Sequence, residues 1–166
     1  MNQTTVFSNL RIATTPFLLL TRGSPLFMAV LLLLLDLIDC DVKKAWNKKI
    51  YDETQCKKNF QYQSCDKLID VSQYIVGISL LYKYSGMSYS YIQLLLFFTF
   101  WRFIGVIFFI YYRDTRYLVP FFDVTKELMV LWVIMNGKVS TNAIALICIC
   151  KLIFEQLKNG KKQEYV

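Results

Sequence analysis

Four aspartates stand in two pairs whose spacing suits helices. Asp36 and Asp39 are three residues apart, and Asp66 and Asp70 are four apart, so each pair occupies one face of a helix. The first pair follows an apolar run and the second leads into another, so both lie at helix ends beside one connecting loop. Four neighbouring carboxylates repel one another unless a cation neutralises them. Because the chain has no histidine, this oxygen-rich set predicts a site for Mg²⁺ or Mn²⁺.

Two plainer interpretations of these acids are open. The aspartates can be solvated helix ends, or they can pair with the nearby side chains of Lys43, Lys44 and Lys67. Either interpretation explains one pair of acids, whereas neither explains two matched pairs that flank a single loop. We therefore expect metal binding.

The elements that must position these acids are membrane helices. Hydrophobic residues make up 55% of the 166 residues, and the mean hydropathy is +0.38. Apolar stretches alternate with short charged segments, which is the pattern of an all-α integral membrane protein with several spans. So many spans in so short a chain indicate a single domain over residues 1–166. We expect six transmembrane helices, over about Leu10–Thr21, Pro25–Lys44, Tyr62–Tyr84, Tyr89–Tyr112, Tyr117–Met135 and Val139–Leu157.

The basic residues predict which end of these helices faces the cytosol. The net charge is +7, and the Lys and Arg residues gather in alternate loops. Only Arg22, Lys83 and Lys138 lie in the opposite set, and positive charge accumulates on the cytosolic side of membrane proteins. This bias places both termini and the Lys43–Asp66 loop in the cytosol. Because topology and contact with membrane lipids explain the lysines, we expect no nucleic-acid partner.

The acids and their surroundings resemble the motif of the CDP-alcohol phosphatidyltransferase family. That motif, Asp-x2-Asp-Gly-x2-Ala-Arg-x8-Gly-x3-Asp-x3-Asp, spans the end of the second and the start of the third transmembrane helix. All four acids fall in register within each half, and Asn9-Leu10-Arg11 with Pro16 is similar to the family's opening. The resemblance covers about Asn9–Tyr74 and is only topological beyond it.

The chain departs from this motif at several positions. Cys40 and Tyr62 replace glycines that let nucleotide and backbone approach closely. Lys43 and Lys44 replace Ala and Arg, and a lysine offers charge to a diphosphate without a bidentate fork. The spacer is also longer, over Ala45–Gln61, in a loop where insertions are tolerated. These departures leave a second interpretation open, a degenerate relative that acts as a metal-binding or interaction protein.

The resemblance implies a reaction of phospholipid biosynthesis on the cytosolic side of a membrane. A phosphatidyl group passes from a CDP-linked lipid, CDP-diacylglycerol, to a small alcohol, and CMP is released. Asp36, Asp39, Asp66 and Asp70 would hold the divalent metal, and Asp70 would also be the catalytic base. Lys43 and Lys44 would contact the diphosphate. The acceptor alcohol is not specified by the sequence, and family members are often homodimers.

Charged residues within the later predicted helices allow two interpretations. Arg102 lies in the middle of a predicted span, where a charge normally faces the bundle interior or a cavity. It either binds a phosphate of the substrate or forms an internal ion pair with Asp123 or Glu127. Asp123, Lys126 and Glu127 share a helical face, and we interpret them first as a structural group and second as part of an acceptor pocket.

A cation transporter unrelated to this family is a third interpretation. Transporters of that kind place their carboxylates near the bilayer midplane, between broken helices. Here the four aspartates lie beside a lysine-rich loop at the membrane surface, which counts against transport.

Overall fold

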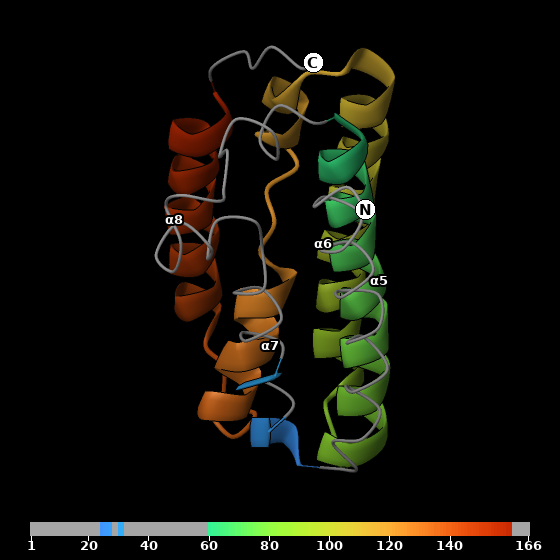
Figure 1. The fold of residues 1–166 in the computed structure, drawn as a ribbon. Coiled ribbons are helices and arrows are strands. Elements are labelled where there is room, and N and C mark those ends of the chain that lie inside the picture. Colours follow the sequence, from blue (N-terminus) through green and yellow to red (C-terminus); the bar gives the residue numbers. More distant parts are fainter. Residues whose placement is uncertain (1–23, 28–29, 32–59, 161–166) are drawn as a thin grey trace, which may run out of the picture.

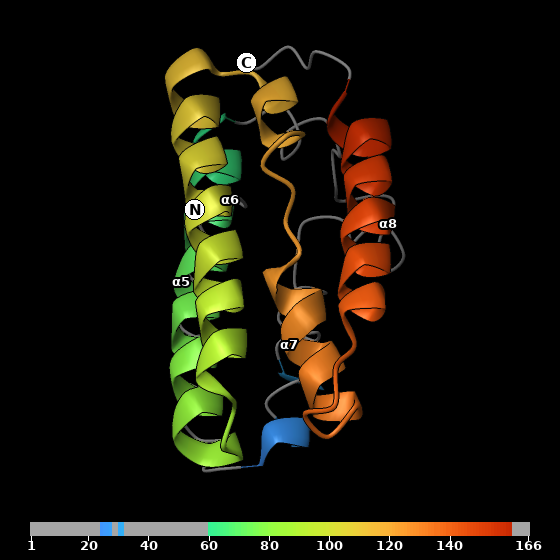
Figure 2. The same ribbon diagram turned by 180° about the vertical axis from the view of Figure 1, so that it is seen from behind.

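The part of the chain that the structure describes is a bundle of helices. The computed structural model describes residues 24–27, 30–31 and 60–160, and no strand occurs within these ranges. The elements in order are α5 (Phe60–Ser85), α6 (Tyr89–Tyr112), the 3-10 helix η2 (Thr115–Leu118), α7 (Thr125–Ile134) and α8 (Thr141–Asn159). In Figures 1 and 2, α5 and α6 lie side by side, and η2 and α7 fill the space between this pair and α8.

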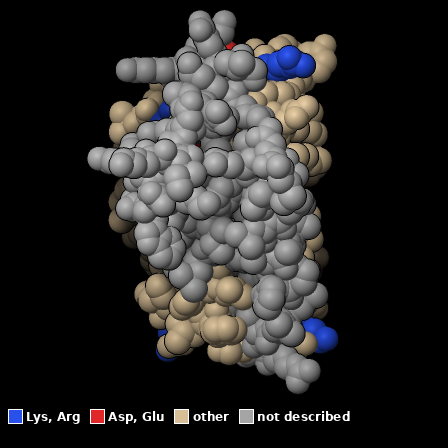
Figure 3. Space-filling model, in the orientation of Figure 1, with Lys and Arg blue, Asp and Glu red and all other residues tan. Residues whose placement is uncertain are grey.

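The helix directions bring the first half of α5, which carries Asp66 and Asp70, toward one end of the bundle. The start of α5, the end of α6, η2 and the end of α8 all lie at the end that is uppermost in Figure 1. The turn between α5 and α6 and the turn between α7 and α8 lie at the other end. Figure 3 shows basic side chains near both ends of the visible face, and apolar or uncharged side chains over much of its described surface between them.

Two of the helix predictions are confirmed closely. The α6 helix has the predicted bounds, and α5 begins two residues before the predicted start at Tyr62 and ends one residue after Tyr84. The turn between them contains Gly86, whose φ of 63° lies in the left-handed region where glycine is favoured. Arg113, at φ 53°, ends α6 in the same conformation.

Serine caps set the starts of two other helices. Ser140 accepts a hydrogen bond of 3.2 Å from the amide of Ala143, so α8 begins two residues later than expected. Ser24 accepts one of 3.3 Å from the amide of Phe27, and residues 25–27 are helical, as predicted for a helix that starts at Pro25. The predicted helix Leu10–Thr21 and most of the second helix lie outside the described residues.

The prediction of one continuous helix over Tyr117–Met135 is wrong. The η2 helix ends at Leu118, and α7 begins only at Thr125, so residues 119–124 form a non-helical interruption. Pro120 accounts for the break, because its nitrogen carries no hydrogen and cannot donate a helical hydrogen bond. We call residues 119–124 the interruption.

Two clusters of buried apolar side chains hold the helices together. The larger cluster joins α5, α6 and α7 through residues such as Tyr74, Leu95 and Leu128, each at most 1% exposed. The smaller cluster contains Val106, Phe109 and Leu118 and packs η2 against α6. The interruption joins the two clusters, because Val124 belongs to the larger one and Leu118, just before the interruption, belongs to the smaller one.

Large apolar side chains also cover outward faces of α6 and α8. Of the described helices, α6 is the one that is long and apolar enough to cross a membrane, judged by length and composition. Its outward residues recur at helical spacing, which gives α6 a continuous apolar face. On the two helices these exposed residues are Leu96, Phe97, Phe100, Phe103, Ile107, Phe108, Leu146, Ile149, Leu152, Ile153, Phe154 and Leu157.

Candidate functional site

Two of the four predicted metal ligands lie on the inward face of α5. Asp66 is 3% exposed and Asp70 is 7% exposed. The buried positions of α5 recur every three or four residues, so the pair falls on the same stripe as the core residues Tyr74 and Leu81. The predicted shared face is therefore confirmed for this pair. Asp36 and Asp39, with Lys43 and Lys44, lie outside the described residues.

A lysine already lies against these two acids. The ammonium nitrogen of Lys67 is 2.9 Å from Oδ2 of Asp66 and 3.9 Å from Oδ2 of Asp70. One of the plainer interpretations, pairing with Lys67, thus holds for this half of the acid set. Lys67 is only partly buried, with 17% of its side chain exposed, and its long stem can move the ammonium toward solvent.

Asp66 and Asp70 do not by themselves form a metal site. Among residues 60–160 and the short described segments before them, no group of three or more candidate ligands occurs. Asp66 and Asp70 supply hard carboxylate oxygens one helical turn apart, which is the chemistry that Mg²⁺ and Mn²⁺ prefer. A divalent metal bound to these two acids would need further ligands from outside the described residues.

A polar connection runs from this acid pair into the bundle. Tyr74 lies one turn beyond Asp70 on the same face of α5 and interacts electrostatically with it. The Tyr74 hydroxyl donates a hydrogen bond to Oδ2 of Asp123, in the interruption, and both residues are buried. The ammonium of Lys126 lies 6.0 Å from the centre of the Tyr74 ring. The candidate metal ligands on α5 are thus joined to the charged residues around the start of α7.

Arg102 contacts the backbone of the interruption. Its Nη1 donates to the carbonyl oxygens of Phe121, at 2.9 Å, and Leu118, at 3.4 Å. The neighbouring indole nitrogen of Trp101 donates to the carbonyl oxygen of Pro120 at 2.9 Å. Two adjacent residues of α6 therefore satisfy carbonyl groups that the break in the helix leaves without helical partners.

Arg102 also forms the internal ion pair that was one of its two predicted roles, but with a different acid. Its Nη2 is 3.9 Å from Oε1 of Glu155 on α8. Of the predicted partners, Asp123 accepts from Tyr74 and interacts electrostatically with Arg102, and Glu127 pairs with Lys151. The residue spacing within α6 does not indicate that Glu155, on α8, is the partner of Arg102.

We refer to these charged and hydroxyl side chains as the interior polar cluster. Its members come from all four long helices or the interruption, and three basic residues balance three acids. They are Tyr74, Arg102, Asp123, Lys126, Glu127, Lys151 and Glu155. Sequence reasoning missed Tyr74, Lys151 and Glu155. The four-residue spacing of Lys151 and Glu155 inside an apolar predicted span was the signal that could have found the last two.

Two carboxylate oxygens of the cluster have no hydrogen-bond donor among the described residues. They are Oδ1 of Asp123 and Oε2 of Glu127, and each of these atoms is buried. Asp123 as a whole is 7% exposed. Buried polar atoms in folded proteins normally have a partner, so these two oxygens indicate unused capacity to accept hydrogen bonds.

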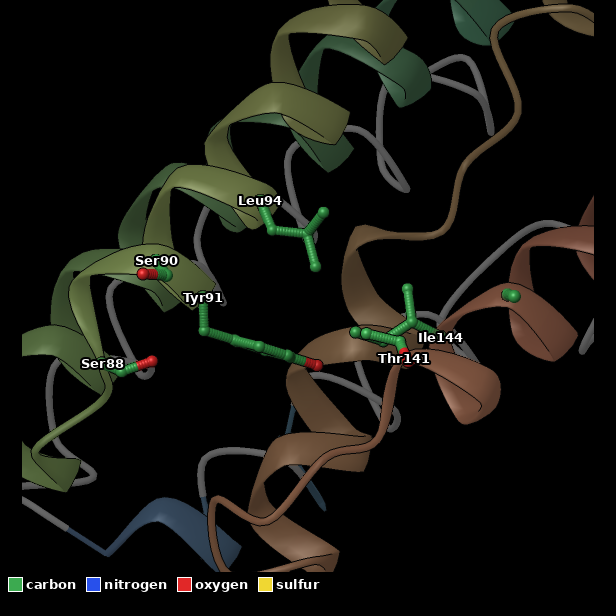
Figure 4. Close-up of a pocket in the computed structure, with 7 residues that line it drawn as sticks. Ser88, Ser90, Tyr91, Leu94, Thr141 and Ile144 are labelled. Carbon is green, nitrogen blue, oxygen red and sulfur yellow. The ribbon is translucent and has the colours of Figure 1, made fainter.

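A separate pocket lies away from the acids. It has a volume of about 440 Å³ and opens between the first turns of α6 and α8, at the end opposite to the start of α5. Figure 4 shows Tyr91 reaching from α6 across the pocket, and its hydroxyl donates to the carbonyl oxygen of Leu128 at 2.9 Å. The lining residues are Ser88, Ser90, Tyr91, Leu94, Thr141, Ile144 and Ala145. This pocket shares no lining residue with the interior polar cluster.

Comparison with known proteins identifies no relative. No protein-family model matches the chain, and no curated protein and no solved structure matches it significantly. The similarity to the CDP-alcohol phosphatidyltransferase family therefore rests on the residues between Asn9 and Tyr74 that carry the motif.

Proposed function

We propose that this chain transfers a phosphatidyl group from a CDP-linked lipid to a small alcohol and releases CMP. The observation that carries the proposal is the pair Asp66 and Asp70, buried one turn apart on α5 and joined through Tyr74 to the interior polar cluster. Acids held inside a helical membrane bundle are costly and usually functional. Their spacing is also that of the second half of the family motif.

Each chemical step has a candidate residue in this arrangement. The acceptor oxygen bonds to the phosphorus of the phosphatidyl group, and the bond from that phosphorus to the CMP oxygen breaks. CMP leaves with the bonding electron pair, and Asp70 takes the proton of the acceptor hydroxyl. Asp36, Asp39, Asp66 and Asp70 would hold Mg²⁺ or Mn²⁺, which would supply stabilisation of negative charge on the diphosphate. Lys43 and Lys44 contact the diphosphate oxygens.

The proposal includes a six-span integral membrane protein with both termini and the reacting groups on the cytosolic side. The apolar α6 helix and the outward apolar faces of α6 and α8 support it. The interruption is compatible with a membrane location, because non-helical backbone at membrane depth is tolerated where protein surrounds it. Here the side chains of Arg102 and Trp101 donate hydrogen bonds to carbonyl groups of the interruption.

One observation favours a second candidate function. Lys67 contacts Asp66 and approaches Asp70, so an ammonium can neutralise this pair without a metal. A chain that relies on this ion pair would be a catalytically inactive relative that serves as an interaction protein in the membrane. Together with Cys40, Tyr62 and Lys44 at motif positions, this contact makes inactivity the main alternative.

The interruption also bears on the third interpretation, a cation transporter. A broken helix is the feature that transporters use, since unwound carbonyl groups coordinate the permeating ion. Here two of these carbonyl groups, those of Leu118 and Phe121, accept hydrogen bonds from Arg102. A fixed guanidinium thus takes the place of a mobile cation, which argues against transport.

The decisive experiment is an assay of CMP release from CDP-diacylglycerol by the purified protein. The assay uses Mg²⁺ or Mn²⁺ with a panel of small alcohols, and we expect metal-dependent release with at least one of them. The double variant Asp66→Asn, Asp70→Asn should release none. Asp114→Asn is the matched control, because Asp114 is a buried acid that pairs with Arg116 and does not belong to the motif or to the interior polar cluster.

Two outcomes would count against the proposal. Absence of CMP release with every alcohol, while the wild type still binds Mn²⁺, would favour the inactive relative. CMP release that is unchanged in the double variant would show that Asp66 and Asp70 take no part in the reaction.

A further inference from the structure

We infer that the acceptor alcohol carries a primary ammonium group, and that Asp123 and Glu127 bind this group. The inference rests on the proposed function, because it specifies the acceptor of that reaction. It uses the interior polar cluster, whose charges the proposed chemistry at Asp66 and Asp70 does not otherwise employ.

The first observation is the state of the two carboxylates. Oδ1 of Asp123 and Oε2 of Glu127 are buried and have no hydrogen-bond donor among the described residues. Contrary to the expectation from the sequence, Asp123 lies in the interruption and not on a helical face with Lys126 and Glu127, but its carboxylate interacts electrostatically with that of Glu127 in the first turn of α7. An ammonium group presents three N–H donors and a positive charge, and it can satisfy both oxygens together.

The second observation concerns the basic residues, which already have partners inside the protein. Arg102 donates to two carbonyl groups and pairs with Glu155, and Lys151 pairs with Glu127. Lys126 lies over the Tyr74 ring and interacts electrostatically with Asp123. A phosphorylated alcohol would have to break these pairs and then lie beside unsatisfied carboxylates, which repel it.

The position of the cluster also suits such an acceptor. Tyr74 connects the two sites, because it lies one turn from Asp70 and donates to Asp123. An amino alcohol bound with its ammonium at Asp123 and Glu127 can direct its hydroxyl toward Asp70, the proposed base. The two functional groups of the ligand then face the two acidic sites that the protein holds on either side of Tyr74.

The test measures binding and turnover with closely matched alcohols. The purified full-length protein is titrated calorimetrically with ethanolamine, with its neutral analogue ethylene glycol, with choline and with glycerol 3-phosphate. We expect ethanolamine to bind at least about tenfold more tightly than ethylene glycol, a difference of about 1.4 kcal/mol. Choline has the same charge without N–H donors, so it should bind more weakly than ethanolamine. CMP release should follow the same order.

Two conservative variants locate the site. Asp123→Asn and Glu127→Gln each keep the shape of the side chain and remove its charge, and each should weaken ethanolamine binding about tenfold. Asp114→Asn, the control, should bind ethanolamine like the wild type. Thermal unfolding of each variant shows whether it is folded, and Glu127→Gln replaces Asp123→Asn if the latter does not fold.

The outcomes separate this inference from the proposed function. CMP release with inositol or glycerol 3-phosphate but not with ethanolamine would overturn the inference and keep phosphatidyl transfer. Ethanolamine binding that depends on Asp123, without CMP release, would keep the ammonium site and overturn the transfer reaction. If ethanolamine neither binds nor reacts, or if both variants bind it normally, the inference is wrong.

Discussion

Arg102 on α6 donates a hydrogen bond of 2.9 Å to the carbonyl oxygen of Phe121, in the interruption between η2 and α7. A buried carbonyl group without a donor costs several kcal/mol, so a break in a buried helix needs donors from a neighbour. Arg102 and Trp101 supply three such hydrogen bonds from two adjacent positions. The buried guanidinium of Arg102 therefore stabilises the interruption. It also interacts with Asp123, which belongs to the proposed acceptor site.

Replacement of this arginine should destabilise the bundle strongly. In Arg102→Ala the two carbonyl groups lose their donors, and Glu155 loses its ion pair while it stays buried. Breaking a buried pair by removing one partner typically costs about 3–5 kcal/mol, and we expect a loss in free energy of unfolding of that size. Denaturant unfolding in mild detergent measures it, with Arg113→Ala at the exposed end of α6 as control. Equal stability of the two variants would contradict this role.

The hydroxyl of Tyr74 should contribute to stability through Asp123. Tyr74→Phe removes the donor to Oδ2 of Asp123 and leaves that oxygen buried without it. An unsatisfied buried acceptor costs about 1–3 kcal/mol, and this is the expected decrease in the free energy of unfolding. Tyr82→Phe, at a position that is 62% exposed on the same helix, should change stability by much less. A negligible effect at Tyr74 would mean that Asp123 finds another donor.

Lys67 distinguishes the enzyme from the inactive relative. If Asp66 and Asp70 bind a divalent cation, the ammonium of Lys67 competes with it, because it contacts the same carboxylates. Lys67→Gln should then raise the affinity for Mn²⁺, by about tenfold for a change of about 1.4 kcal/mol. Titration followed by electron paramagnetic resonance of Mn²⁺ measures it, with Lys83→Gln at the far end of α5 as control. Weaker Mn²⁺ binding in Lys67→Gln would show that the lysine supports the site instead.

The contact between α6 and the interruption should not tolerate a larger residue at Gly105. A Cβ atom added there would overlap Cβ of Phe121, on the backbone that Arg102 holds. Gly105→Ala must therefore push the interruption away, and we expect a loss of about 1–3 kcal/mol. Gly86→Ala meets no atom within 4 Å and is opposed only by its positive φ, so its cost measures backbone strain alone. A Gly105→Ala variant as stable as the wild type would show that α6 and the interruption can separate freely.

The α5 and α6 helices could be predicted from the sequence because local signals mark both ends of each. Gly86 separates two apolar segments that are bordered by tyrosines, so the end of α5 and the start of α6 are well defined by the sequence. The interruption was missed because the apolar content of residues 117–135 was given more weight than Pro120. That proline removes a backbone donor in the middle of the run, so the signal was present in the sequence.

In the candidate site, too, features set within one helix could be predicted from the sequence, whereas contacts between helices could not. The shared face of Asp66 and Asp70 follows from their spacing within one helix, and the structure confirms it. The pairing of Arg102 with Glu155 joins two helices that are far apart in the sequence. No periodicity within one helix specifies which residues of another helix lie opposite, so Glu155 could not be identified from the sequence as a partner of Arg102.

The uneven distribution of charge among the helices has a consequence for biogenesis. A translocon releases a segment into lipid according to its hydrophobicity, and charged residues near the centre of a segment oppose release. The α6 helix passes this test by its own composition, whereas α8 carries Lys151 and Glu155 in its interior. Arg102 meets Glu155 only after α8 has been synthesised. In the proposed membrane protein, the charge of Arg102 therefore has no ion-pair partner on α8 while α7 and the start of α8 are being synthesised.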